Sequence, residues 1–148
     1  MTPSELLSFL RANKWAVQAS VTPNGTPQAA VIGFVVTDDF ELVFDTLDST
    51  RKARNLRSNS AVAFVIGGLV DGERSTVQYE GRVDEPRGLE LDRLRELHFA
   101  RFPEGRARLA WPGLIHLRVR PTWIRFSDFS CEPPRTVEFD VGLLVRPA

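Results

Sequence analysis

The feature that most restricts the fold is a hairpin signal followed by a strand that is apolar on both faces. Apolar side chains recur at every second position of residues 15–21, which is the period of a half-buried strand. Asn24-Gly25 then separates this run from a second one and favours a tight hairpin, because both residues tolerate positive φ. Within the return strand, residues 28–37, the stretch 29–36 is apolar on both faces. One face fits a core, so the other needs a second apolar partner, which is a subunit, a planar ligand or both.

The rest of the chain is predicted to form further strands and a few helices. Thr2 begins a capping box for a short helix that ends near Asn13. The other expected elements are a helix that begins after one of the capping residues 48–50 and ends near residue 59, a helix over residues 89–102, and strands over residues 40–46, 61–66, 74–83, 114–127 and 137–141. About six long antiparallel strands would close into a barrel, because closure removes exposed sheet edges.

The composition fits a single domain over all 148 residues. The 19 basic and 19 acidic residues cancel, which argues against a general nucleic-acid binder or a protein of anionic membrane surfaces. One cysteine, Cys131, excludes an internal disulfide and a cysteine-based zinc site, and no metal-ligand spacing is present, so we expect no metal. No apolar run approaches roughly 20 residues and the N-terminus lacks a signal pattern, so we expect a cytoplasmic protein without a membrane span.

The segment that carries chemistry begins where a strand ends in Thr46. The helix that follows carries Arg51 and Lys52 in its first turn. A helix N-terminus already holds roughly half a positive charge, so two cations there are locally unfavourable. A bound dianion would offset this charge, because the helix amides, the Thr46 hydroxyl and both cations can converge on a phosphate. The alternative is a solvated basic face on a surface helix.

The order of these features resembles the pyridoxamine 5'-phosphate oxidase-like, FMN-binding split-barrel superfamily. The matching features are the Asn-Gly hairpin, the apolar strand, Thr46, Arg51-Lys52, Asn55-Leu56, the strand from Asn59 to Phe64, Gly81, and the run 119–126. The resemblance covers about residues 4–128 and leaves 129–148 as a C-terminal tail. It implies a mainly β, six-stranded antiparallel split barrel with a few helices, which forms a homodimer with flavin at the subunit interface.

The resemblance also implies the cofactor contacts. Arg51 and Lys52 match the phosphate-binding pair, and Thr46 matches the hydroxyl residue at the strand end, with Asp45 beside it. The strand whose backbone follows the flavin ring is matched by Ala30, Val31, Ile32, Gly33 and Val35. A polar contact on the later strand is matched by Thr76, or by Gln78 if the register slips by two.

The implied function is an FMN-dependent oxidoreductase that acts on an unidentified small-molecule substrate. The flavin carries the redox chemistry, so no protein side chain need act as acid or base, and no catalytic residue is named. True pyridoxamine phosphate oxidases carry an Arg-Leu-His-Asp-Arg-type segment after the last strand. Residues 127–135 lack this segment and its histidine, so oxidation of pyridoxamine phosphate is not expected.

Two alternatives stay open on the same fold. The first is a non-enzymatic module that binds or senses flavin or haem, in which His98 or His116 would be the axial ligand. Isolated histidines are more often packing or surface residues, which weighs against that assignment. The second is a reductase that uses the deazaflavin F420, whose phosphate the same basic helix would hold.

Overall fold

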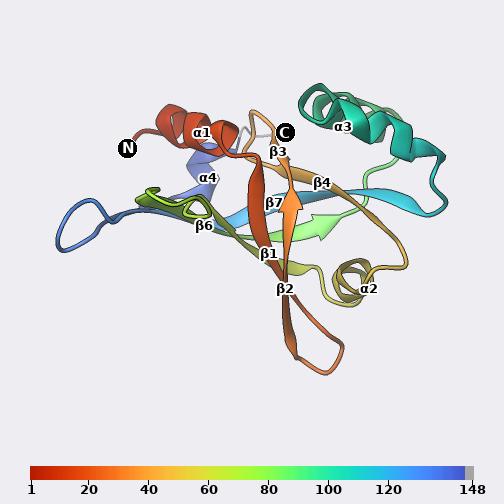
Figure 1. The fold of residues 1–148 in the computed structure, drawn as a ribbon, viewed down its shortest axis with the longest axis horizontal. Helices are drawn as coiled ribbons and strands as arrows, with labels where there is room; N and C mark the ends of the chain where they lie inside the picture. The colour runs from red at the N-terminus through yellow and green to blue at the C-terminus, as the bar shows by residue number, and fades with distance from the viewer. Residues whose placement is uncertain (146–148) are drawn as a thin grey trace.

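An antiparallel sheet of eight strands forms the framework of the computed structural model, which describes residues 1–145 (Figure 1). The strands are β1 (Trp15–Val21), β2 (Pro27–Gly33), β3 (Val35–Val36), β4 (Leu42–Leu47), β5 (Ala61–Ile66), β6 (Ser75–Asp84), β7 (Leu114–Asp128) and β8 (Arg135–Phe139). Their order in the sheet is β2-β1-β5-β6-β7-β4-β3, and β8 pairs with β7. The mainly β class is confirmed, with eight strands in place of the six that we expected.

The first additional strand comes from a break in the predicted return strand. The run 28–37 is interrupted at Phe34 into β2 and β3. β2 pairs with β1, whereas β3 pairs with β4, at the opposite end of the strand order. One interrupted run therefore joins both ends of the sheet, which curls into a half-barrel. The remaining strand, β8, is the one that we predicted over residues 137–141 of the C-terminal tail, and it begins two residues earlier.

The predicted helices are present, and the first two begin directly after the capping residues Thr2 and Thr50. They are α1 (Pro3–Ala12), α2 (Arg51–Ser58) and α3 (Gly88–Arg101), joined by a 3-10 helix η1 (Pro103–Ala110) and a short α4 (Val141–Leu144). Thr2 and Glu5 form the expected capping box of α1. The 3-10 helix was not predicted, because Pro103 and Gly105 indicate only a helix break. No helix in residues 1–145 is long and apolar enough to cross a membrane.

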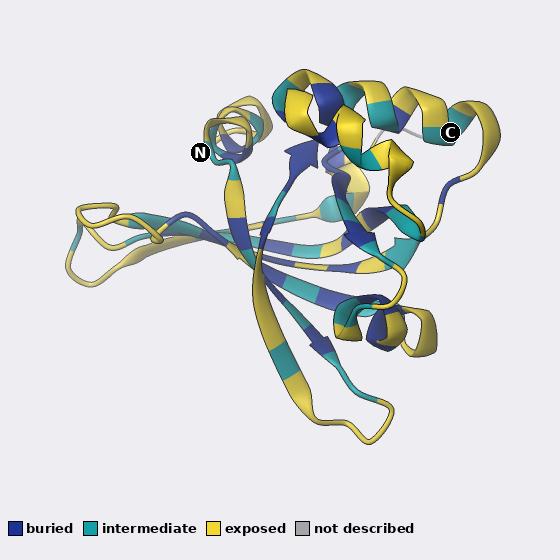
Figure 2. Cartoon of the chain, turned by 45° about the vertical axis from the view of Figure 1, so that its right-hand side comes forward, coloured by how far each residue is buried: buried dark blue, intermediate teal, exposed yellow. Residues whose placement is uncertain are grey.

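The hydrophobic core has two layers, separated by the wall of the barrel. Inside the barrel, Phe64 packs edge-on against both Phe44 and Tyr79, and the Tyr79 hydroxyl donates to the Phe40 carbonyl. Outside the wall, α3 covers β3 and β4 and buries a smaller apolar cluster, in which Val43 has no exposed surface. Figure 2 shows that much of the central sheet is buried, whereas the β1–β2 hairpin is largely exposed. Polar side chains are also buried under α3, among them His98 and His116.

Candidate phosphate-binding site

A cavity of about 620 Å³ lies beside the N-terminus of α2. Its walls come from β1 and β2 on one side and from residues 49–54 on the other. Arg51, Lys52 and Arg54 line it, and no acidic residue in the described part of the chain does so. Among residues 1–145, none of these three cations forms an ion pair. The cavity therefore concentrates uncompensated positive charge at a helix N-terminus and is suited to an anion.

The N-terminus of α2 is capped by Thr50. The Thr50 hydroxyl oxygen accepts a hydrogen bond from the Ala53 amide at 3.3 Å and donates to the Leu47 carbonyl at 2.8 Å. Thr46, the hydroxyl residue at the end of β4, lies 3.0 Å from the Thr50 hydroxyl and does not line the cavity. Thr46 therefore supports the cap, and the first turn of α2 contains no acidic residue that would compensate its dipole.

A side-chain amide of the sheet contacts Arg51. With its oxygen turned toward α2, the Gln28 amide on β2 accepts a hydrogen bond from Arg51 Nε at 2.9 Å, and its nitrogen lies 2.7 Å from Asn55 Nδ2. Asn55 is 4% exposed and its Nδ2 atom is 3.1 Å from the Ser20 hydroxyl on β1. Because these partners belong to the sheet and to α2, the guanidinium is positioned at the cavity before any ligand binds.

Gln18 adds a buried donor to the same cavity. Its side chain is 1% exposed, it lines the cavity from β1, and its Nε2 atom has no hydrogen-bond partner among the described residues. An unpaired buried N–H group costs about 1–3 kcal/mol, so a ligand oxygen in the cavity would recover that free energy. Sequence reasoning missed this donor, because the alternation along β1 points to its apolar residues as the buried set.

The structure brings only part of the predicted cofactor-binding set to this cavity. Ala30, Arg51 and Lys52 line it, and β2 leaves it beyond Ala30. The predicted contacts that do not line it are Val31, Ile32, Gly33, Val35, Asp45, Thr46, Thr76 and Gln78. Thr76 and Gln78 lie on β6, which is separated from β2 by β1 and β5.

Asp45 faces the space under α3 and not the cavity. Its carboxylate accepts hydrogen bonds from Arg108 Nη1 at 3.3 and 3.4 Å, and it lies opposite His116 in the pairing of β4 with β7. His98, on α3, packs against the His116 ring with the centroids 5.2 Å apart. Both imidazoles are only 2% exposed. Burial lowers the pKa of both rings, that of His116 to about 4, so both are neutral at pH 7.

These neutral imidazoles predict a loss of stability in acid. The folded-state pKa of His116 is below its ordinary value of 6.5, so its contribution is complete above pH 6.5 and is lost as the pH falls toward 4. Asp45 opposes the shift, whereas His98 and Arg95 reinforce it. Urea denaturation in metal-free buffer should give a free energy of unfolding lower at pH 5 than at pH 7 by on the order of 1 kcal/mol. His116→Asn should flatten this slope, and an unchanged slope would contradict the assignment.

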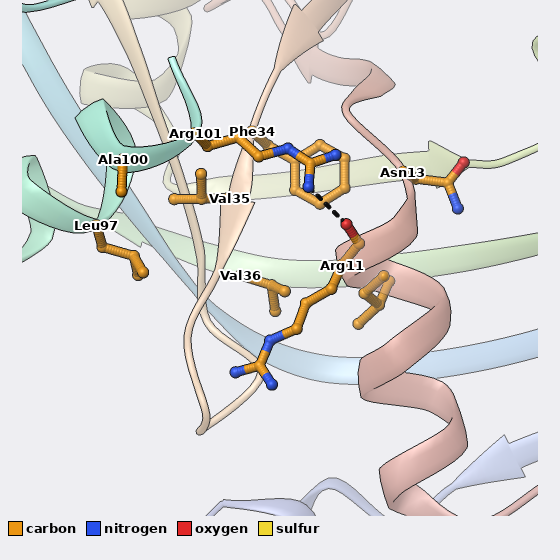
Figure 3. Close-up of a pocket in the computed structure, with 9 residues that line it drawn as sticks. Arg11, Asn13, Phe34, Val35, Val36, Leu97, Ala100 and Arg101 are labelled. Carbon is orange, nitrogen blue, oxygen red and sulfur yellow. Dashed lines mark hydrogen bonds between the residues drawn. The ribbon is translucent and has the colours of Figure 1, made fainter. Parts of the chain in front are cut away.

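A second cavity, of about 240 Å³, lies between α1, β3 and α3 (Figure 3). Its walls are mainly apolar, and Arg101 crosses it to donate to the main-chain carbonyl of Arg11 at 2.8 Å. The Arg11 side chain pairs with Asp38. This cavity shares no lining residue with the one at α2, and its arginines already have partners within the chain.

The chain is similar in sequence to a known protein family. A family model described as "Pyridoxamine 5'-phosphate oxidase" matches residues 2–127. The match spans most of the chain, so this protein belongs to the pyridoxamine 5'-phosphate oxidase-like family, and the resemblance drawn from the sequence is confirmed. No curated protein matches the chain in sequence.

Solved structures share this fold at low sequence identity. A haem binding protein from Mycobacterium smegmatis has a TM-score of 0.82 and 17% identity, covering 96% of this chain and 59% of that one. The haem storage protein HutZ from Vibrio cholerae has a TM-score of 0.70 and 17% identity, covering 80% and 88%. A putative pyridoxamine 5'-phosphate oxidase from Listeria innocua has a TM-score of 0.65 and 19% identity, covering 84% and 96%. This chain thus spans 59% of the length of the Mycobacterium smegmatis protein.

Proposed function

We propose that this protein binds FMN, with the phosphate at the N-terminus of α2 and the ring beside β2, and that it is an oxidoreductase. The observation that carries the proposal is the cavity at α2, where Arg51 and Lys52 meet a buried Gln18 Nε2 atom that has no partner, and where residues 1–145 place no acidic side chain. A volume of about 620 Å³ is in the usual range of small-molecule sites. A phosphate dianion would neutralise the two cations of the first turn and accept from the amides there.

In this proposal the flavin ring lies along β2. Ala29 and Ala30 line the cavity, so the strand offers backbone and small side chains next to the phosphate site. On the opposite face of this hairpin, Val31 is 63% exposed and Trp15, on β1, is 52% exposed. A second subunit would cover these apolar residues, which supports the proposal of a homodimer.

Bound FMN supplies electron transfer to and from a small-molecule substrate. The chain's own residues then have binding and orienting tasks. Arg51, held by Gln28, fixes the phosphate end, while Gln18 donates from the floor of the cavity. Because residues 127–135 lack the product-binding segment of the true oxidases, pyridoxamine phosphate is not the proposed substrate.

The test is a titration of the purified full-length protein with FMN, followed by flavin fluorescence and absorption. We expect FMN to bind at micromolar concentration or below, and riboflavin, which lacks the phosphate, to bind at least a hundredfold more weakly. Failure to bind FMN would overturn the proposal. A copurified deazaflavin spectrum would replace FMN with F420, whose phosphate fits the same cations.

Haem is a second candidate, because two of the solved structures with this fold are a haem binding protein and a haem storage protein. His98 and His116 are each 2% exposed, so neither offers an open face to a group of that size as packed under α3. A Soret band in the purified protein, lost in the His98→Ala or His116→Ala variant, would support this second candidate.

Gln18→Leu is predicted to change ligand affinity and stability in opposite directions. Without ligand, the substitution removes a buried unpaired donor, so the melting temperature should stay the same or rise by a few degrees. With FMN, the loss of one hydrogen bond should weaken binding about tenfold. Differential scanning fluorimetry and a fluorescence titration measure the two effects. Unchanged FMN affinity would exclude Gln18 as a contact.

A further inference from the structure

The polar residues under α3 form a second site that is separate from the cavity at α2. Asp45 and His116 are directly opposite each other on β4 and β7, and His98 lies above them on α3. Each of the three side chains offers a donor atom, and these atoms all lie within 4.8 Å of one another. None of the three lines the cavity at α2.

Two of these donors are buried without a partner. His98 Nδ1 and His116 Nε2 have no hydrogen bond among the described residues, although both side chains are 98% enclosed, each with 2% of its surface exposed. Phe102 packs on the His98 ring at 5.1 Å, and Phe99 packs on the His116 ring at 5.7 Å, both measured between centroids. Buried unpaired nitrogens are rare in native proteins, and two of them in one cluster require a common explanation.

We infer that Asp45, His98 and His116 bind a divalent transition-metal ion of the zinc class. Two imidazoles and one carboxylate form a donor set that suits Zn²⁺ and its neighbours and leaves a coordination position open. Zinc ligands lie roughly 2.0–2.2 Å from the metal, so the donor atoms must draw together by about 1 Å on binding. The carboxylate supplies the negative charge, and the aromatic rings exclude competing water.

Two arginines control the affinity of this site. Arg95 Nε donates to His116 Nδ1 at 3.4 Å, and Arg108 Nη1 donates to Asp45 at 3.3 and 3.4 Å, which are long hydrogen bonds. A metal at Nδ1 displaces Arg95 directly. A metal at Nε2 moves the ring proton to Nδ1, where it would face the Arg95 N–H group. Metal binding through either nitrogen of His116 therefore requires Arg95 to release the ring.

The experiment is a titration of the chelator-treated full-length protein with Zn²⁺ by calorimetry and with Co²⁺ by visible absorption. We expect one equivalent of metal, and Co²⁺ bands typical of nitrogen and oxygen ligands. Asp45→Asn and His116→Gln should each weaken binding at least tenfold. Asp92→Asn, which removes an exposed carboxylate of α3, is the matched control and should leave the affinity unchanged. Absence of binding, or binding that Asp45→Asn does not weaken, would overturn the inference.

Arg95→Gln keeps the inference testable even if the ligand variants do not fold. It removes the positive charge and places an amide oxygen where the His116 N–H group can donate, so Zn²⁺ should bind at least threefold more tightly. Equal or weaker binding, with circular dichroism unchanged, would contradict the site. FMN affinity measured on the same variant should stay at its original value, which separates this site from the one at α2.

Discussion

Replacing both Arg51 and Lys52 with alanine is expected to weaken FMN binding at least a hundredfold while leaving the melting temperature almost unchanged. Each charge-assisted hydrogen bond to a phosphate contributes on the order of 1.5–3 kcal/mol, and 1.4 kcal/mol corresponds to a factor of ten in affinity. Neither cation is ion-paired in the described structure, and both lie at the positive end of α2, so their loss removes no stabilising contact with a carboxylate. Fluorescence titrations with FMN and thermal melts measure the two quantities.

The matched control is Arg57→Ala, which removes a basic residue of the same helix that pairs with Glu85. Arg57 does not line the cavity, so this variant should bind FMN as the original protein does. Riboflavin affinity should be similar in all three proteins, because the contact in question is to the phosphate. A loss of FMN affinity smaller than fivefold in the double variant would contradict the phosphate assignment.

Gly81→Ala is expected to destabilise the fold by about 3 kcal/mol, near the upper end of the cost of overpacking a core. A Cβ atom at this position would lie 2.5 Å from the Arg120 carbonyl oxygen and 2.6 Å from Val119 Cγ1. The register between β6 and β7 shifts at Glu80/Gly81, where the two backbones approach closely. β7 is held by β6 and β4, so it cannot move aside without disturbing other pairings.

Urea denaturation followed by circular dichroism measures this change, and Glu80→Ala is its control. Glu80 is exposed at the neighbouring position, so its replacement should alter the free energy of unfolding by less than about 0.5 kcal/mol. Equal midpoints for Gly81→Ala and the original protein would show that the bulge relaxes around the added methyl group.

Much of the fold follows from short-range signals in the sequence. The capping box at Thr2, the Asn-Gly hairpin and the cap before Arg51 each depend on residues within four positions, and the structure contains all three. The same holds for the basic first turn of α2, because a helix start and its charges are local properties.

The features that sequence reasoning missed depend on contacts between distant segments. Along β1 the structure buries Ala16, Gln18 and Ser20 and leaves Trp15 exposed, because α2 covers the end of the barrel on that face and supplies Asn55 to Ser20. Alternation alone does not say which face a distant helix will cover. The break at Phe34 likewise depends on distant segments, because the residues before it pair with β1 and the residues after it pair with β4.

The two separate histidines show the same limit. His98 and His116 are 18 positions apart and carry no metal-ligand spacing, yet the packing of α3 on β4 and β7 brings them against Asp45. Only the crossing of a helix over a strand pair creates that proximity, so no pattern along the chain predicts it.

The interrupted run of β2 and β3 has a consequence for how the molecule unfolds. These strands are separated by Phe34 alone, yet they pair with β1 and β4 at opposite ends of the strand order. Separation of β2 from β1 therefore strains the hydrogen bonds between β3 and β4, because Phe34 alone joins β2 to β3. Fraying from an edge, the usual first step in the melting of an open sheet, is coupled here to the loss of the opposite edge. We therefore expect the half-barrel to open as one cooperative unit.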